Sequence, residues 1–124
     1  MIFILQKDNV MEYFKSISDL IAGLNKLKQE EWIHTDMAVW MSNPEKADFY
    51  YLPWDYMQSL EDDEVFENDD GAELPLALKD KNLKEWMLVN LLSHIANSID
   101  WKVEGIKEFI DQVNYYREFD TFKP

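Results

Sequence analysis

The sequence lacks features on which several protein classes depend. It has no cysteine, which excludes disulfide bonds and cysteine-ligated metals and leaves no need for an oxidising compartment. It has only three glycines and four prolines, and no apolar run approaches the roughly 20 residues of a membrane-spanning helix. The apolar start at residues 2–5 is too short for a signal-peptide core. We therefore expect a cytoplasmic protein that does not bind membranes.

Basic residues are also scarce. The chain has 12 lysines and arginines against 25 aspartates and glutamates, which gives a net charge of −13. Such a chain repels phosphate backbones and anionic lipids, so we expect a basic protein partner and no direct binding of nucleic acid. Because 47% of the residues are hydrophobic, the chain can still bury a core. A length of 124 residues predicts a single domain that covers residues 1–124.

The negative charge is concentrated in residues 61–73. This segment holds eight carboxylates and no base, which is more than half of the net charge of −13. Clustered carboxylates are typical calcium ligands, but an EF-hand register that places Gly71 at the turn puts Phe66 and Ala77 at the first and last ligand positions. The segment is therefore interpreted as an acidic loop, either solvated or facing a partner.

The first part of the chain favours one short strand and one helix. Residues 2–5 favour a short strand or an N-terminal arm. Ser16 and Asp19 have the spacing of a capping box, in which the hydroxyl accepts from the Asp19 amide. Apolar residues follow at helical spacing, which predicts a helix over residues 17–29.

The next part favours a hairpin. Aromatic and β-branched residues flank a turn-like break at residues 42–46, which predicts strands at residues 37–41 and 49–52. Both faces of these strands are apolar, which indicates a sheet that is covered by helices on one side and by a partner or loop on the other. Residues 54–60 predict one helical turn that leads into the acidic segment.

The C-terminal half favours two longer helices. Residues 74–78 predict an edge strand, because Pro75 can occupy a position that needs no ladder donor. Apolar stripes at helical spacing predict helices over residues 83–95 and 103–116. The predicted fold class is α+β, with about three helices packed on a small, mainly antiparallel sheet.

The sequence contains no catalytic pattern. Neither His34 nor His94 has a second histidine one helical turn away, and His94 is interpreted as a structural residue. There is no Gly-x-Ser-x-Gly turn and no glycine-rich phosphate loop. Adjacent carboxylates on a polar loop do not provide the one raised and one ordinary pKa that acid and base catalysis require. We therefore expect no enzyme activity, no cofactor and no metal site.

Large aromatic side chains lie before and within the acidic segment. An aromatic anchor surrounded by charge is typical of tight, electrostatically steered interfaces. The alternative is that these rings only fix the segment to the core. The predicted partner-binding residues are Trp54, Tyr56, Glu61, Asp62, Asp63, Glu64, Phe66, Glu67, Asp69 and Asp70.

In size, charge and lack of catalytic motifs, the chain resembles the small acidic immunity proteins of bacterial toxin–immunity pairs, including those of contact-dependent growth inhibition. In addition, residues 109–122, a helix that runs into Tyr115-Tyr116 and an Asp-x-Phe motif, are similar to the C-terminal tail of an uncharacterised bacterial domain family. That tail brings no known activity. The likeness to immunity proteins implies a basic toxin domain, often a nuclease, as the partner.

We therefore expect an immunity protein that neutralises a toxin by occluding its active site. The alternative from the same observations is a DNA mimic, or another acidic interaction module from a phage or mobile element, that blocks a DNA-binding protein. A dense carboxylate surface imitates a run of phosphates in either case.

Overall fold

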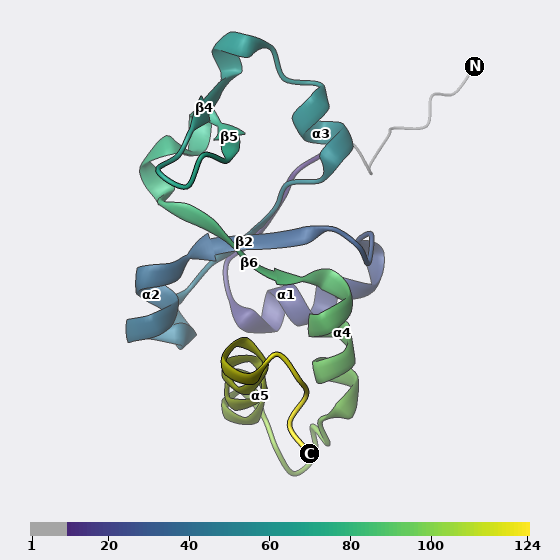
Figure 1. The fold of residues 1–124 in the computed structure, drawn as a ribbon. Coiled ribbons are helices and arrows are strands. Elements are labelled where there is room, and N and C mark those ends of the chain that lie inside the picture. Colours follow the sequence, from purple (N-terminus) through teal and green to yellow (C-terminus); the bar gives the residue numbers. More distant parts are fainter. Residues whose placement is uncertain (1–9) are drawn as a thin grey trace, which may run out of the picture.

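The structure, a computed structural model, describes residues 10–124 (Figure 1). The predicted strand at residues 2–5 lies outside the described residues. The α+β fold class is confirmed, because helices pack on a four-stranded antiparallel sheet. This sheet has the order β1-β3-β2-β6, with β1 at Glu12–Phe14, β2 at Trp32–Asp36, β3 at Phe49–Tyr51 and β6 at Leu83–Leu88. A two-stranded sheet pairs β4 (Val65–Glu67) with β5 (Glu73–Pro75).

The helices lie between and after these strands. They are α1 (Ile17–Gly23), α2 (Met37–Ser42), α3 (Trp54–Gln58), α4 (Val89–Ser98) and α5 (Ile106–Phe119). Short 3₁₀ segments are η2 (Leu24–Lys26), η3 (Pro44–Lys46), η4 (Asp62–Glu64) and η5 (Leu76–Lys81). Within residues 10–124, no helix is long and apolar enough to cross a membrane.

Two apolar clusters cover the two faces of the four-stranded sheet. Side chains of a strand alternate between faces, so Phe49 and Tyr51 of β3 join the larger cluster while Tyr50 and the following Leu52 join the smaller one. The larger cluster includes residues of α1, α4 and α5, and the smaller one includes residues of β5 with residues of α3 and β4 packed against it. Figure 1 shows α1, α4 and α5 on one side of the sheet and α3 and the β4–β5 hairpin on the other. The expected helices on one side are confirmed, and the other side is covered by helix α3 and a hairpin of the same chain.

An aromatic group ties α2 to the sheet in the larger cluster. The ring centroid of Trp86 lies 4.7 Å from that of Trp40 and 4.9 Å from that of Phe49. The indole N–H of Trp40 donates to Oδ1 of Asn114 at 2.9 Å, which also links α2 to α5. These contacts connect α2 to the sheet and to α5.

The predicted helix over residues 17–29 is confirmed at its start and ends earlier than expected. The Ser16 hydroxyl accepts from the backbone N–H of Asp19 at 3.1 Å, as the capping pattern predicts. The α-helix ends at Gly23 and continues as the 3₁₀ turn η2. The Phe14 ring lies so close to Gly23 that an added Cβ would meet it at 2.7 Å.

The predicted strand at residues 37–41 is wrong, because these residues form helix α2. The Asp36 carboxylate accepts from the backbone N–H groups of Ala38 and Val39 at 3.0 and 3.3 Å. This N-cap starts a helix directly after β2. The hairpin partner of β3 is therefore β2, and only the second predicted strand, now β3, is confirmed.

The predicted helix over residues 83–95 is wrong in its first half. Residues Leu83–Leu88 form β6 and pair with β2, and the helix begins at Val89. The pairing register shifts between Ile33 and His34, an irregularity that re-aims strand side chains. The predicted last helix and the helical turn at residues 54–60 are confirmed as α5 and α3, and the predicted strand at residues 74–78 is confirmed only at its start, as β5.

The end of the chain folds back on α4. The Phe122 ring stacks on His94 with 3.9 Å between ring centroids and lies 5.0 Å from the ring of Tyr116. These contacts agree with the interpretation of His94 as a structural residue.

Candidate functional site

The acidic segment, predicted as a loop, contains regular structure. It begins with η4, continues into β4 and returns through a tight turn into β5. In this turn Oδ1 of Asn68 accepts from the backbone N–H groups of Asp70 and Ala72 at 3.0 and 2.9 Å. Gly71 adopts a φ of 82°, which favours glycine. The carboxylates are therefore displayed on a defined backbone.

One lysine pairs with both aspartates at the tip of the hairpin. The Lys84 ammonium of β6 pairs with the carboxylates of Asp69 and Asp70, the latter at 2.9 Å. These contacts lower the pKa of the Asp69 carboxyl and raise the pKa of Lys84, chiefly through the hydrogen bonds between them. The two predicted binding residues at the tip are therefore already paired within the chain.

The carboxylates of η4 are more available. Oε1 of Glu64 accepts from the backbone N–H of Glu61 at 2.8 Å, so this pair holds the 3₁₀ turn together. In the part of the chain that the structure describes, the exposed side chains of Asp62, Asp63 and Glu67 make no hydrogen bond or ion pair. They are the carboxylates best placed for a partner.

The three predicted aromatic anchors differ in exposure. Trp54 is 65% exposed, whereas Tyr56 and Phe66 are partly buried against the smaller cluster. The Lys79 ammonium lies 6.0 Å from the Phe66 ring centroid, within cation–π range. Burial, with a smaller effect of the Glu64 charge, raises the pKa of the Tyr56 hydroxyl. Phe66 therefore helps to fix the hairpin and Tyr56 helps to fix α3, whereas Trp54 is the exposed anchor.

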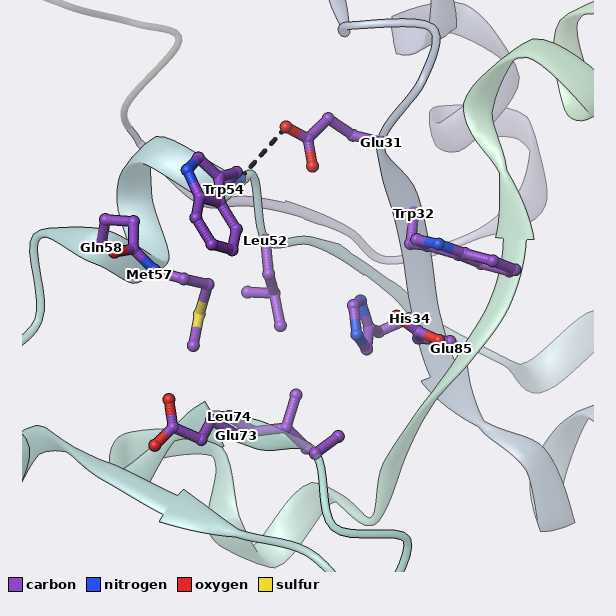
Figure 2. Close-up of a pocket in the computed structure, with 11 residues that line it drawn as sticks. Glu31, Trp32, His34, Leu52, Trp54, Met57, Gln58, Glu73, Leu74 and Glu85 are labelled. Carbon is purple, nitrogen blue, oxygen red and sulfur yellow. Dashed lines mark hydrogen bonds between the residues drawn. The ribbon is translucent and has the colours of Figure 1, made fainter.

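A pocket of about 360 Å³ opens beside Trp54, between α3, β5 and the strands β2 and β6 (Figure 2). It is lined by apolar side chains, with Met57 and Leu52 on one side and Leu74 facing them (Figure 2). The carboxylate-bearing residues among its lining are Glu31, Glu73 and Glu85. The full lining consists of Glu31, Trp32, His34, Leu52, Trp54, Met57, Gln58, Ala72, Glu73, Leu74 and Glu85.

His34 of β2 lies in the wall of this pocket. It is only 8% exposed, and its Nδ1 is buried without a hydrogen-bond partner among the described residues. Removal from water lowers the pKa of the His34 imidazole to about 4, so the ring is neutral at physiological pH. A buried polar atom without a partner is unusual in a folded protein and calls for a physical explanation.

Sequence reasoning did not assign His34 or the pocket a role. The pocket joins residues from four elements, and the misplaced strand at residues 37–41 left His34 outside the predicted sheet. A usable signal was present, since Trp32 and His34 alternate with the apolar Ile33 and so share the opposite face of a strand.

The geometry suits recognition of a cation or a basic protein. Within residues 10–124, no group of three or more histidine, aspartate or glutamate side chains is arranged to hold a metal ion.

No family model, curated protein or solved structure matches the chain. The likeness to immunity proteins therefore stays a prediction.

Proposed function

We propose that the chain is an immunity protein that binds a basic toxin domain in the cytoplasm and occludes its active site. The binding surface is the acidic lobe, defined as residues 54–82 together with the pocket beside Trp54. In this proposal the chain only binds, and it performs no catalysis of its own.

The supporting observation is the charge of the acidic lobe. Residues 54–82 contain ten carboxylates and two lysines, and they lie on the opposite side of the four-stranded sheet from α1, α4 and α5 (Figure 1). A surface of one sign attracts an oppositely charged partner over several ångströms and raises the association rate. The exposed Trp54 beside an apolar pocket adds the kind of anchor that slows dissociation.

A nuclease toxin suits this surface best. Its active-site cleft is built to bind phosphates, so an ordered array of carboxylates competes for the same positive potential. An inhibitor that only covers an active site needs no catalytic groups of its own. A surface of exposed acids is sufficient for this role.

The test is co-expression with a toxin encoded by the adjacent gene, followed by kinetics on the purified pair. The Asp62→Asn/Asp63→Asn variant should slow association by about tenfold at low salt, with little effect at high salt. The matched control is Asp111→Asn/Glu118→Gln, which removes the same charge from exposed positions on α5. Failure to bind or protect against the toxin, or equal association rates for both variants, contradicts the proposal.

A DNA mimic is the second candidate, favoured by the defined backbone of the acidic segment. A 3₁₀ turn followed by a hairpin fixes the spacing of its carboxylates, as mimicry of a phosphate row requires. A DNA mimic should displace duplex DNA from a DNA-binding protein of the same cell, and Asp62→Asn/Asp63→Asn should weaken this displacement. Displacement without protection against the toxin would favour this second function.

A further inference from the structure

We propose that the pocket beside Trp54 receives the guanidinium group of an arginine side chain, and that this arginine belongs to the basic partner. That the arginine belongs to the partner rests on the proposed function. The binding of a guanidinium group itself depends only on the pocket.

The charge of the pocket selects a cation. Glutamates from three separate segments of the chain line it: Glu31 precedes β2, Glu73 lies on β5 and Glu85 lies on β6. Neither Glu73 nor Glu85 makes a hydrogen bond or ion pair with another described side chain. None of the described residues that line the pocket is a lysine or an arginine. Its negative charge is therefore not compensated within the pocket.

The wall of the pocket also contains a polar group that the protein's own described side chains leave without a hydrogen-bond partner. The His34 ring lines the pocket while its Nδ1 is buried without a partner among the described residues. A neutral imidazole has one nitrogen that accepts and one that donates, so it can meet an N–H donor without charge repulsion. A protonated imidazole would repel a cation, and the low pKa of His34 prevents this at neutral pH.

The apolar parts of the pocket favour arginine over lysine. Leu52, Met57 and Leu74 can cover the aliphatic stem of a long side chain, and the exposed Trp54 indole offers a flat face. A guanidinium group stacks on aromatic faces, is weakly hydrated and presents five donors, whereas an ammonium group is strongly hydrated and presents three. The volume of about 360 Å³ leaves room for one arginine side chain.

The test uses N-acetyl-arginine methylamide as the probe and the whole chain as the receptor. Nuclear magnetic resonance should show saturable shifts of the His34 imidazole and the Trp54 indole. The matching citrulline derivative, which has nearly the same shape without the charge, should give no saturable shift. The lysine derivative should bind more weakly than the arginine probe.

Two variants separate the pocket from the general charge of the acidic lobe. Glu73→Gln/Glu85→Gln should weaken binding of the arginine probe by about tenfold, since each charge-assisted hydrogen bond is roughly twice as strong as a neutral one. Asp62→Asn/Asp63→Asn removes the same charge outside the pocket and should leave probe binding within about twofold. Both pairs are exposed, and a retained dispersed spectrum shows that the fold is intact.

The outcomes distinguish this inference from the proposed function. No saturable shift, an equal response to citrulline, or equal weakening in both variants overturns the arginine pocket, and toxin binding can then still rest on η4. Arginine binding without any toxin binding supports the pocket and overturns the immunity proposal.

Discussion

The carboxylate of Glu31 accepts a hydrogen bond from the backbone N–H of Trp54 at 3.1 Å. This contact joins the segment before β2 to the first residue of α3, which are 23 positions apart in the chain. The N-cap residue of α3 is Pro53, whose side chain has no group that could accept from the helix. Glu31 therefore serves as a cap supplied from outside the helix, and it fixes the backbone at one edge of the pocket.

Replacement of Glu31 by alanine should remove this cap and destabilise the protein. Loss of a capping acceptor typically costs about 1 kcal/mol, so the free energy of unfolding of Glu31→Ala should fall by about that amount. Glu31→Gln retains an oxygen that can accept and should lose less. Urea unfolding of the two variants measures the difference, and equal stabilities would show that the contact does not hold α3.

His34 should make stability depend on pH. Its pKa is lowered from 6.5 to about 4, so between these values the unfolded chain binds a proton that the folded chain does not. The neutral imidazole therefore costs the folded state nothing above about pH 6.5. Below that pH the free energy of unfolding decreases, and the loss reaches about 3 kcal/mol by pH 4.

The His34→Gln variant provides the comparison. Glu31, Glu73 and Glu85 line the same pocket in both proteins, so the two proteins differ only at residue 34. Urea unfolding at intervals from pH 7 to pH 4 should show a steeper loss in the wild type than in His34→Gln. Parallel curves would mean that the imidazole is protonated without cost in the folded state.

The elements that sequence could predict are those with one dominant local signal. The α5 stripe and the Ser16 cap each gave such a signal, and both are confirmed. Residues 83–95 gave a misleading one, because Trp86 and Met87 of β6 precede Leu92 and Ile95 of α4 and all four are buried. A continuous apolar run does not distinguish a buried strand from a buried helix. Residues Leu83–Leu88 form a strand because they pair with β2, which is distant in the sequence.

The candidate site was only partly predictable for a similar reason. Charge must remain in water, so the exposed acids were identifiable from composition alone. The ordering of their backbone depends on the Asn68 turn and on packing of Phe66 against the smaller cluster. The pocket depends on four elements meeting at His34, which no local pattern reports.

Lys84 should control the titration of the hairpin tip. Its ammonium lowers the pKa of the Asp69 carboxyl, so Lys84→Met should raise that pKa toward the value of an ordinary aspartate. Because the folded pKa is depressed, the stabilising effect of the pair is present at neutral pH and is lost as pH falls through the folded pKa. Carboxyl ¹³C shifts measure the titration, and Lys81→Met, an exposed lysine on η5, is the control that should leave Asp69 unchanged.

The hairpin also carries an unfavourable pair of like charges, for which the proposed function offers a reason. Glu67 of β4 lies directly opposite Glu73 of β5, and both side chains are exposed. Directly opposed residues of antiparallel strands share one face, so like charges at this position destabilise the hairpin. A surface selected only for stability would avoid this pairing, whereas a surface that must attract a basic partner benefits from both charges.

This trade-off predicts opposite effects of one substitution on stability and binding. Glu67→Lys replaces repulsion by a cross-strand ion pair and should raise the free energy of unfolding by about 0.5 kcal/mol, while Glu67→Gln, which only removes repulsion, should lie between it and the wild type. The association rate with a basic partner should be highest for the wild type, lower for Glu67→Gln and lowest for Glu67→Lys, because the negative charge of the acidic lobe decreases in that order. Thermal unfolding and stopped-flow association measure the two series. If Glu67→Lys is more stable and binds equally fast, the repulsion between Glu67 and Glu73 serves no role in recognition.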